Sequence, residues 1–585
     1  MKHVIILGGG VAGLSAAHEL LKRDFKVSVY EHKNIPGGKA RSLDVPFSGK
    51  DGRKDLPGEH GFRFFPRFYK HLPATMKEIP VGTEGKTVYD NLVDTTRILI
   101  ARFDKAGIRT SSRFPRNRAD IEVMLKAIFD SDAGFEPGEI EFFAERIWQL
   151  MTSCKARRLE EYERIGWWEF IEADNKSEAY KSLLAMGLTR TLVAAQPKLA
   201  STKTGGDILL QLLFDIAKPG MSSDRVLNAP TNDAWIDPWL EYLNTTYSDK
   251  FNYQLNTEFV NFETDIKSGK ITGVNIRPVH RGERACITGC GEIELKKADQ
   301  YIAALPVEVM AKKISPDMLK VDPTLKSIKT LAPNVSWMNG FMFYLNHDVD
   351  VDHGHTIYVD SPWALTSISQ IQFWKDFQIQ DYGNGKVETI LSVDISDWFS
   401  DGILSFDGVK KKASECTPEE IRDDVWAQLK KSLNVEGTVL LKDEYIEDWF
   451  LDPDIVTPDE ERPSKTINLE PLLVNQVNTW HLRPQAHTRI HNLYLASDYV
   501  QTNTDLATME GANEAARRAV NSIIEREDLK LDTCEIWDLE EPFFLSFWRW
   551  LDKRRFKKGQ PWDTKTPFSG GFFSKLKYKF IKLLK

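Results

Sequence analysis

The first 31 residues alternate between apolar runs and polar breaks in the order expected of a strand, a helix and a second strand. An apolar run at residues 4–7 leads into a glycine-rich turn, and apolar side chains then recur at helical spacing over residues 14–21. A second apolar run at residues 27–30 ends at an acid. This pattern predicts a β-α-β unit with two buried parallel strands.

The turn between the first strand and the helix has the glycine spacing of a dinucleotide site. In Gly8-x-Gly10-x-x-Gly13 the first glycine allows the tight turn, the second allows close approach of a pyrophosphate, and the third allows close packing of helix on strand. The backbone N–H groups at the helix start, around Val11 and Ala12, face the phosphates. We therefore predict that this turn binds a dinucleotide.

The acid that ends the second strand indicates which dinucleotide binds. Glu31 stands 18 residues after Gly13, where a carboxylate can accept both ribose hydroxyls, and this favours FAD or NAD over NADP. Lys2 and His3 before an apolar stretch would also suit a secretory signal. The glycines break that stretch and no cleavage site is separable, so we interpret the N-terminus as mature and cytosolic.

The remaining pattern predicts two interleaved domains in an α/β fold. The expected elements are a helical insertion over 113–220, a helix at 236–246, strands at 251–262, 267–276 and 298–306, recurrent strands over 335–450 with a helix near 417–433, a strand at 492–498 and a helix at 507–525. We assign residues 1–100, 236–310 and 475–530 to a discontinuous Rossmann-like nucleotide-binding domain. Residues 101–235 and 311–474 form an α+β substrate domain with the helical insertion, and 531–585 form a tail.

Composition narrows the class of protein. A chain of 585 residues with 42% hydrophobic and 28% charged residues is typical of a globular protein of two or three domains. Its five cysteines are scattered, which favours a reducing compartment, and the one close pair, Cys286 and Cys290, is interpreted as structural or incidental. We predict no metal site. No window of 18 apolar residues is present, so no membrane-spanning helix is predicted.

The C-terminal tail differs in charge from the rest of the chain. The net charge is −8, but residues 549–585 carry 12 Lys/Arg against Asp552 and Asp563, a local +10 that leaves −18 elsewhere. Aromatic residues precede and accompany these cations, which suits attachment to the surface of an anionic membrane. A helix docked on the acidic body of the protein is the alternative. Nucleic acid is not expected, because no recognition fold accompanies the cations.

The motifs at the two ends, in this order, make the chain resemble the flavin-containing amine oxidase and phytoene desaturase superfamily. It is most similar to the branch of carotenoid desaturases and hydroxysqualene dehydroxylase-like proteins. The likeness rests on Glu31 followed by Gly37-Gly38-Lys39, and on Ala496-Ser-Asp498 followed by residues 507–512. It covers about residues 1–72, 235–306 and 490–525, and implies FAD as the cofactor.

The resemblance also implies roles for individual residues. Lys39 and Arg41, after the Gly37-Gly38 turn, would meet the pyrophosphate, and the backbone of Val260 would contact the adenine. A carboxylate at Asp498 can accept hydrogen bonds from ribityl hydroxyls, and a helix starting near Met509 points its positive end at the flavin. Glu510 and Ala512 complete the expected set, although Asp498 and Glu510 also suit the capping of a helix.

One departure from the family pattern concerns the substrate chemistry. Related desaturases commonly carry a histidine two residues after a glycine, where this chain has Gly61-Phe62-Arg63. An arginine is not a base near neutral pH, so Arg63 can only orient the substrate or stabilise negative charge. His60 and Glu59 are the neighbouring catalytic candidates, with structural roles as the alternative for each.

The sequence leads to one functional hypothesis and two alternatives. The first is an FAD-dependent oxidoreductase that desaturates a long apolar, isoprenoid-like substrate by hydride transfer to flavin N5, with quinone or oxygen as electron acceptor. The second is a flavin amine oxidase, and the third is a non-catalytic lipid carrier of the same fold. We expect a cytoplasmic protein whose tail attaches it to the inner face of the membrane.

Overall fold

The computed structural model describes most of the chain between residues 1 and 563. The residues outside the description are 62, 83–84, 110–117, 120, 123–124, 126–133, 187–196, 217–221, 223, 282–286, 290, 458–465 and 564–585. The predictions for Cys286 and Cys290, and for the last 22 residues of the tail, therefore lie outside the described residues.

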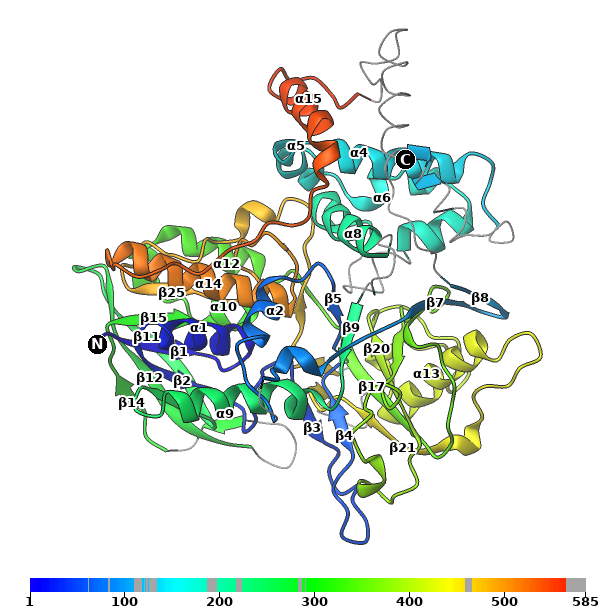
Figure 1. The fold of residues 1–585 in the computed structure, drawn as a ribbon, viewed down its shortest axis with the longest axis horizontal. Coiled ribbons are helices and arrows are strands. Elements are labelled where there is room, and N and C mark those ends of the chain that lie inside the picture. Colours follow the sequence, from blue (N-terminus) through cyan, green and yellow to red (C-terminus); the bar gives the residue numbers. More distant parts are fainter. Residues whose placement is uncertain are drawn as a thin grey trace.

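A five-stranded parallel sheet forms the centre of the nucleotide-binding part. Its strand order is β10-β2-β1-β15-β25, and the strands are β1 (His3–Leu7), β2 (Lys26–Tyr30), β10 (Phe251–Gln254), β15 (Gln300–Ala303) and β25 (Leu493–Leu495). The helix α1 (Val11–Leu21) is buried at every residue because it lies between this sheet and α14 (Met509–Arg526) (Figure 1). The predicted β-α-β unit and discontinuous Rossmann-like sheet are confirmed.

The parallel register brings distant loops to one edge of this sheet. Leu7 pairs with Ala303, and Ala303 pairs with Leu495, so the carboxyl ends of β1, β15 and β25 lie side by side. The glycine turn after β1 and the Asp498 loop after β25 therefore meet at the same edge. Ligands in open α/β sheets bind at this edge.

A second, seven-stranded sheet stands beside the first (Figure 1). Its order is β21-β17-β20-β19-β18-β7-β8, and its strands are β7 (Arg97–Arg102), β8 (Lys105–Arg109), β17 (Asn339–Leu345), β18 (Gly354–Tyr358), β19 (Thr366–Ser369), β20 (Thr389–Ile395) and β21 (Ile446–Leu451). The helix α13 (Pro418–Leu433) packs near β7 and β8 and shares a core with this sheet. The strands predicted over 335–450 and the helix near 417–433 are present.

Two predicted domain boundaries fall inside elements. The boundary at residue 100 lies within β7, which belongs to the seven-stranded sheet. The boundary at 310 lies within α10 (Val307–Lys313), and α10, α11 (Pro316–Val321) and α12 (Lys326–Leu331) share the core of the five-stranded sheet. Composition does not change at either position, so the sequence held no signal for these limits.

The helical insertion forms a projection above the two sheets (Figure 1). Its described helices are α4 (Glu139–Thr152), α5 (Lys155–Glu160), α6 (Trp167–Phe170) and α8 (Thr202–Ile216), and α15 (Ser546–Phe556) from the tail packs on α4 and α5. Arg157 forms an ion pair with buried Asp552 at 2.9 Å, and Trp148 meets Trp548 edge to face. The described part of the tail therefore docks on the insertion. None of the helices described is long and apolar enough to cross a membrane.

The remaining strands and α-helices include one four-stranded antiparallel sheet and several shorter elements. They are β3 (Ser42–Asp44), β4 (Pro57–Glu59), β5 (Phe65–Pro66), α2 (His71–Met76), β6 (Leu92–Asp94), β9 (Asp224–Leu227), α9 (Asp237–Thr246), β11 (Thr257–Asp265), β12 (Lys270–Arg281), β13 (Ile287–Gly289), β14 (Glu294–Lys296), β16 (Val335–Ser336), β22 (Ile455–Val456), β23 (Ile467–Asn468) and β24 (Leu472–Leu473).

Candidate functional site

A cavity of about 620 Å³ extends from the carboxyl edge of the five-stranded sheet to the seven-stranded sheet and α8. The predicted residues that line it are Gly8, Gly10, Val11, Ala12, Glu31, Gly37, Gly38, Lys39, His60, Arg63, Asp498, Met509 and Ala512. The predicted residues that do not line it are Gly13, Arg41, Glu59, Val260 and Glu510. The glycine turn after β1 and the Asp498 loop after β25 thus line the same cavity.

The glycine turns form a backbone surface with no side chains in the way. Gly8 has φ +101°, and a Cβ atom there would lie 2.4 Å from the carbonyl oxygen of Ala304. Gly38 has φ +60°, and its Cβ would lie 2.9 Å from the Cα of Gly10. The first turn of α1 contains no acid to offset the positive end of the helix. These features fit the pyrophosphate of FAD.

Glu31 is a buried carboxylate held at the edge of the cavity. It accepts the backbone N–H of Gly9 at 2.7 Å and of Lys33 at 2.9 Å, and its Oε1 lies 2.8 Å from Nδ1 of His32. Burial by itself would raise the pKa of Glu31, but His32 and the two N–H groups lower it below its ordinary value. The side chain therefore stays ionised, as an acceptor for ribose hydroxyls requires.

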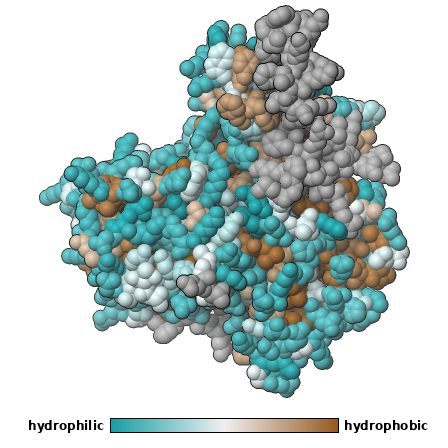
Figure 2. Space-filling view, viewed as in Figure 1, coloured by the Kyte–Doolittle hydropathy of each residue, from teal (hydrophilic) through white to brown (hydrophobic). Residues whose placement is uncertain are grey.

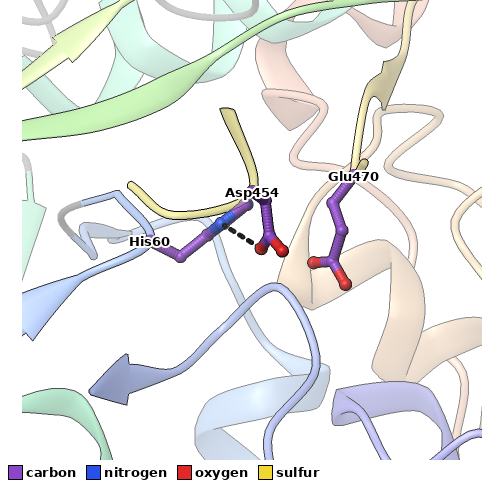
Figure 3. A group of neighbouring side chains, drawn as sticks. All are labelled: His60, Asp454 and Glu470. Atoms are coloured by element: carbon purple, nitrogen blue, oxygen red, sulfur yellow. Dashed lines mark ion pairs between the residues drawn. The ribbon is translucent and has the colours of Figure 1, made fainter. Parts of the chain in front are cut away.

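A buried network of charges adjoins the cavity (Figure 3). Nδ1 of His60 lies 3.6 Å from Asp454, and Glu470 faces the same space from a separate segment. Arg41 pairs with both Asp454 and Glu470, and Lys33 lies 2.8 Å from Glu470. Burial opposes ionisation of Glu470, but these two cations hold its pKa well below the ordinary value.

Three side chains of this network, those of His60, Asp454 and Glu470, are of the types that bind metal ions. Single ligand atoms of His60, Asp454 and Glu470 lie within 4.8 Å of one another. Arg41 and Lys33 already pair with Asp454 and Glu470, and a third carboxylate, Asp452, lies 2.7 Å from Nδ1 of His60, so the possible ligands are engaged in an ion-pair network. Of the two cations predicted to meet the pyrophosphate, Arg41 donates to Asp454 in this network and does not line the cavity, whereas Lys39 does line it.

The three catalytic candidates occupy different positions. Arg63 and His60 line the cavity, and Arg63 also donates to the carbonyl oxygen of Lys39. Glu59 does not line the cavity, because its carboxylate accepts the N–H of Thr231 at 2.9 Å and the hydroxyl of the same residue. Burial raises the pKa of the Glu59 carboxyl to about 7, although Arg63 and Thr231 act in the opposite direction.

The carboxylate of Glu510 does not face the cavity. It accepts the backbone N–H groups of Lys70 and His71, both at 2.8 Å, and of Leu72 at 2.9 Å, and it contacts the His71 ring. It thereby caps the start of α2. The positions next to it, Met509 and Ala512, do line the cavity, as expected for the first turn of α14.

Gly13 and Val260 also lie outside the cavity lining. A Cβ at Gly13 would lie 2.0 Å from the carbonyl oxygen of Gly8, so Gly13 allows helix and strand to pack. The carbonyl of Val260 accepts Nζ of Lys313 at 3.0 Å. The preceding residues of the same strand, 257–259, line the cavity, whereas Val260 does not, and its contact with the adenine stays a prediction.

The far end of the cavity is mostly apolar. Ile98 and Ile100 on β7, Ile357 on β18, Leu209, Leu212 and Leu213 on α8, Leu125 and Leu506 line it. In the register of the sheet Ile100 pairs with Ile357, Ile357 with Thr366, and Thr366 with Asp394. One row of the sheet therefore runs from an apolar end to a carboxylate.

Asp394 is the acid at the polar end of that row. It is buried, lines the cavity and attracts the guanidinium of Arg63. A Cβ at Gly61 would lie 2.9 Å from an oxygen of Asp394, so only glycine allows the loop of His60 to approach this closely. A second polar pair, His355 and Asp224, lines the cavity near Ile98, which pairs with His355 in the sheet.

The sequence did not indicate several of these residues. Lys33, Asp394, Asp454 and Glu470 belong to no motif, and Asp454 lies more than 400 positions from its partner Arg41. Asp394 is the next-to-last residue of β20, and an acid near the end of a strand is the one local signal that could have drawn attention to it.

Comparisons with known proteins agree with this architecture. Residues 6–79 match the model of the NAD(P)-binding Rossmann-like domain, and residues 272–524 match that of the flavin containing amine oxidoreductases. The 15-cis-phytoene desaturase of Synechococcus elongatus is 21% identical over 90% of this chain and 96% of its own length. The all-trans-zeta-carotene desaturase of Myxococcus xanthus is 33% identical over 17% of this chain and 20% of its own.

Solved structures share the fold. Cyclohexylamine oxidase from Brevibacterium oxydans superposes with a TM-score of 0.56 at 12% identity, over 90% of this chain and 99% of its own. An oxidoreductase from Methanosarcina mazei superposes with a TM-score of 0.55 at 13% identity, over 89% and 100% of the two chains. At this identity the likeness concerns the fold alone.

Proposed function

This chain is an FAD-dependent oxidoreductase of the flavin-containing amine oxidoreductase superfamily, and on that premise we propose that it dehydrogenates a long apolar substrate of isoprenoid type. The observation that carries the proposal is the apolar arm of the cavity, formed by β7, β18 and α8. An oxidoreductase is not a carrier, so the third hypothesis from the sequence is set aside.

The apolar arm suits a hydrocarbon chain better than a small polar molecule. Its walls are isoleucine and leucine side chains from two sheet strands and one helix. Contact between these side chains and a hydrocarbon removes apolar surface from water, which stabilises the complex. Arg63 and Asp394 lie at the polar end of the arm, and one further polar pair, His355 and Asp224, lines the cavity near Ile98. A substrate that lies along the arm would place one of its C–H bonds near that polar end.

FAD bound in this cavity would supply a hydride acceptor, the N5 atom of the flavin. The glycine turns would hold its pyrophosphate, Glu31 its ribose and Asp498 its ribityl hydroxyls. Arg63, which lines the cavity, would supply positive potential there. Quinone or oxygen would reoxidise the cofactor.

Formation of a C=C bond also releases a proton from the neighbouring carbon. Asp394 is the carboxylate that we assign to accept it, because it is buried, lines the cavity and lies in the same row of the sheet as the apolar residues. The guanidinium of Arg63 and the carboxylate of Asp394 attract each other across the cavity.

Amine oxidation is the second candidate. The solved relatives include an oxidase of cyclohexylamine, and Asp394 could pair with a substrate ammonium. Arg63, which also lines the cavity, opposes the entry of a cation. The apolar character of the arm therefore favours the hydrocarbon.

We also propose that the protein attaches to a membrane surface through α15. Phe543 is 89% exposed, and Phe544, Phe547 and Trp550 are exposed beside it. Figure 2 shows hydrophobic residues on the projection that carries α15. Five cations follow, at Lys553, Arg554, Arg555, Lys557 and Lys558. Aromatic side chains next to cations suit the headgroup region of an anionic bilayer.

The function is tested by bleaching of the flavin absorption. The purified holoenzyme is mixed without oxygen with an isoprenoid hydrocarbon in detergent micelles, and separately with benzylamine and putrescine. Bleaching by the hydrocarbon alone supports the proposal, and bleaching by an amine alone replaces it with amine oxidation. Mass spectrometry of lipids from cells with and without the protein then identifies the product.

A further inference from the structure

A strap of residues 530–542 connects α14 to α15 without forming a helix or a strand. Figure 1 shows it as the orange to red coil that runs along α14 and then rises to α15. It crosses from the five-stranded sheet domain to the helical insertion. Only Cys534 and Pro542 in it are buried.

The first half of the strap is held by the nucleotide-binding part. The N–H of Cys534 donates to Asn521 of α14 at 2.6 Å. The N–H of Trp537 donates to Nε2 of His71 at 3.0 Å, and its carbonyl accepts Nδ2 of Asn503 at 2.9 Å.

The second half is held by the helical insertion. The N–H of Glu540 donates to the side chain of Gln211 on α8 at 2.9 Å, and its carbonyl accepts the amide of the same side chain at 3.0 Å. Glu541 forms an ion pair with Arg158. The change of partner between Trp537 and Glu540 marks the seam between the two bodies.

Leu539 lies at this seam. It packs in a small apolar cluster with Phe68, Ile208 and four residues that line the cavity. Those four are Tyr69, Leu212, Leu506 and Met509. The side chain of Leu539 is therefore one residue layer away from the cavity.

From this arrangement we propose that the seam beneath Leu539 is the entrance for the apolar substrate and that the strap is its gate. A segment with few buried side chains and no regular structure opens at lower free energy than a helix or a sheet strand. Leu539 packs against the cluster in which Leu212 of the insertion meets Tyr69 and Leu506 of the other body, so displacing Leu539 would expose this apolar cluster. The opening is apolar, as a hydrocarbon requires.

The position of the gate links it to the lipid surface. The strap ends at Pro542, and the next two residues, Phe543 and Phe544, are the first of the exposed aromatic residues proposed above to contact the membrane. A substrate dissolved in the bilayer would reach the seam without crossing water. This inference rests on the proposed apolar substrate, and its test below uses no turnover, so the two can fail separately.

The test measures the access of an alkyl chain to the cavity. Thr366 lines the cavity on β19, and its hydroxyl has no hydrogen-bond partner among the described residues, so Thr366→Cys introduces a thiol with little loss. The FAD-loaded variant is mixed with phosphatidylglycerol vesicles that carry N-dodecylmaleimide. Peptide mass spectrometry gives the rate at which the introduced thiol is alkylated, separately from the native cysteines.

Two changes at Leu539 should alter that rate in opposite directions. Leu539→Ala removes contacts across the seam and is expected to raise the rate about tenfold. Leu539→Trp fills the seam and should lower it. Leu531→Ala, at an exposed residue of the same strap, is the matched control and should leave the rate unchanged.

Each outcome decides the proposal. Opposite changes at Leu539 with an unchanged Leu531→Ala variant support the gate. Equal rates in the two Leu539 variants, or the same acceleration in Leu531→Ala, would show that alkyl chains enter elsewhere. Circular dichroism and retention of FAD in each variant show that the comparison is between folded holoenzymes.

Discussion

Nδ1 of His71 lies 2.7 Å from a carboxylate oxygen of Glu510, while Nε2 of the same ring accepts the N–H of Trp537 at 3.0 Å. One imidazole therefore joins the start of α2, the first turn of α14 and the strap. Because Met509 next to Glu510 lines the cavity, this joint supports one wall of the cavity through two residues that do not line it.

Replacing Glu510 by glutamine should destabilise the protein more than it weakens FAD binding. The change weakens buried charge-assisted hydrogen bonds, which predicts a loss of roughly 1–3 kcal/mol in the free energy of unfolding at pH 7. Thermal unfolding measures it, with Glu525→Gln at an exposed position of α14 as control.

The pH dependence of this effect has a definite sign. Burial opposes ionisation, but His71 and the N–H groups lower the pKa of Glu510 in the folded protein. Its contribution is therefore present above the ordinary glutamate pKa of 4.5 and is lost as the pH falls toward the lowered folded value. A gap between wild type and Glu510→Gln that stays constant down to acid pH contradicts this assignment.

Replacing Glu31 by alanine should weaken FAD retention. The carboxylate is ionised at the cavity edge and accepts two backbone N–H groups, so its loss removes a charged acceptor for the ribose. A loss of roughly 1.5–3 kcal/mol corresponds to a rise of about 10- to 150-fold in the dissociation constant. Titration of the apoprotein with FAD measures it. Glu31→Gln keeps an acceptor and should show a smaller rise; equal binding by all three proteins would remove Glu31 from the site.

Glu59 should make the protein less stable as the pH rises through the weakly acidic range. Burial raises its folded pKa to about 7 from 4.5, so the folded state keeps a proton that the unfolded chain has already lost. Its stabilisation is full below about pH 4.5 and decreases until about pH 7, by on the order of 3 kcal/mol. Denaturation in urea at several pH values measures this decrease. Glu59→Gln should reduce the decrease, and an unchanged slope in the variant would assign it to other groups.

Asp394→Asn should slow the reduction of the flavin by substrate. An amide cannot accept the released proton, and loss of a general base typically costs about 10²- to 10⁴-fold in rate. Stopped-flow bleaching gives the rate, and FAD titration shows whether cofactor binding is retained. Thr366→Ser, at the paired position on β19, is the control. A variant that reduces its flavin at the wild-type rate would exclude Asp394 as the base.

Reversing charge beside α15 should release the protein from anionic vesicles. Lys557→Glu with Lys558→Glu removes two cations, each worth about 1 kcal/mol near an anionic leaflet, which predicts at least a roughly 30-fold loss of partitioning. Co-sedimentation with phosphatidylglycerol and phosphatidylcholine vesicles measures it. Lys326→Glu with Lys329→Glu, two exposed lysines on α12, is the control. Equal pelleting of both variants would reject α15 as the contact.

The sequence by itself determined the parts of the fold that depend on local order. The β-α-β unit at the start, the strand before Asp498 and the helix α14 were predicted because period-2 and period-3.6 patterns reflect burial within one segment. Gly8, Gly10 and Glu31 were predicted because the dinucleotide turn needs residues at fixed spacing within one unit.

Only the tertiary structure decided which charges meet. Glu510 has the local appearance of a residue at the flavin, but its partner is 439 positions away, and Arg41 turns to Asp454, 413 positions away. The energy of a buried ion pair depends on distance and on exclusion of water, and neither is written in the spacing of the residues. For the same reason the apolar arm and Leu539 at its seam emerged only when separate segments were brought together.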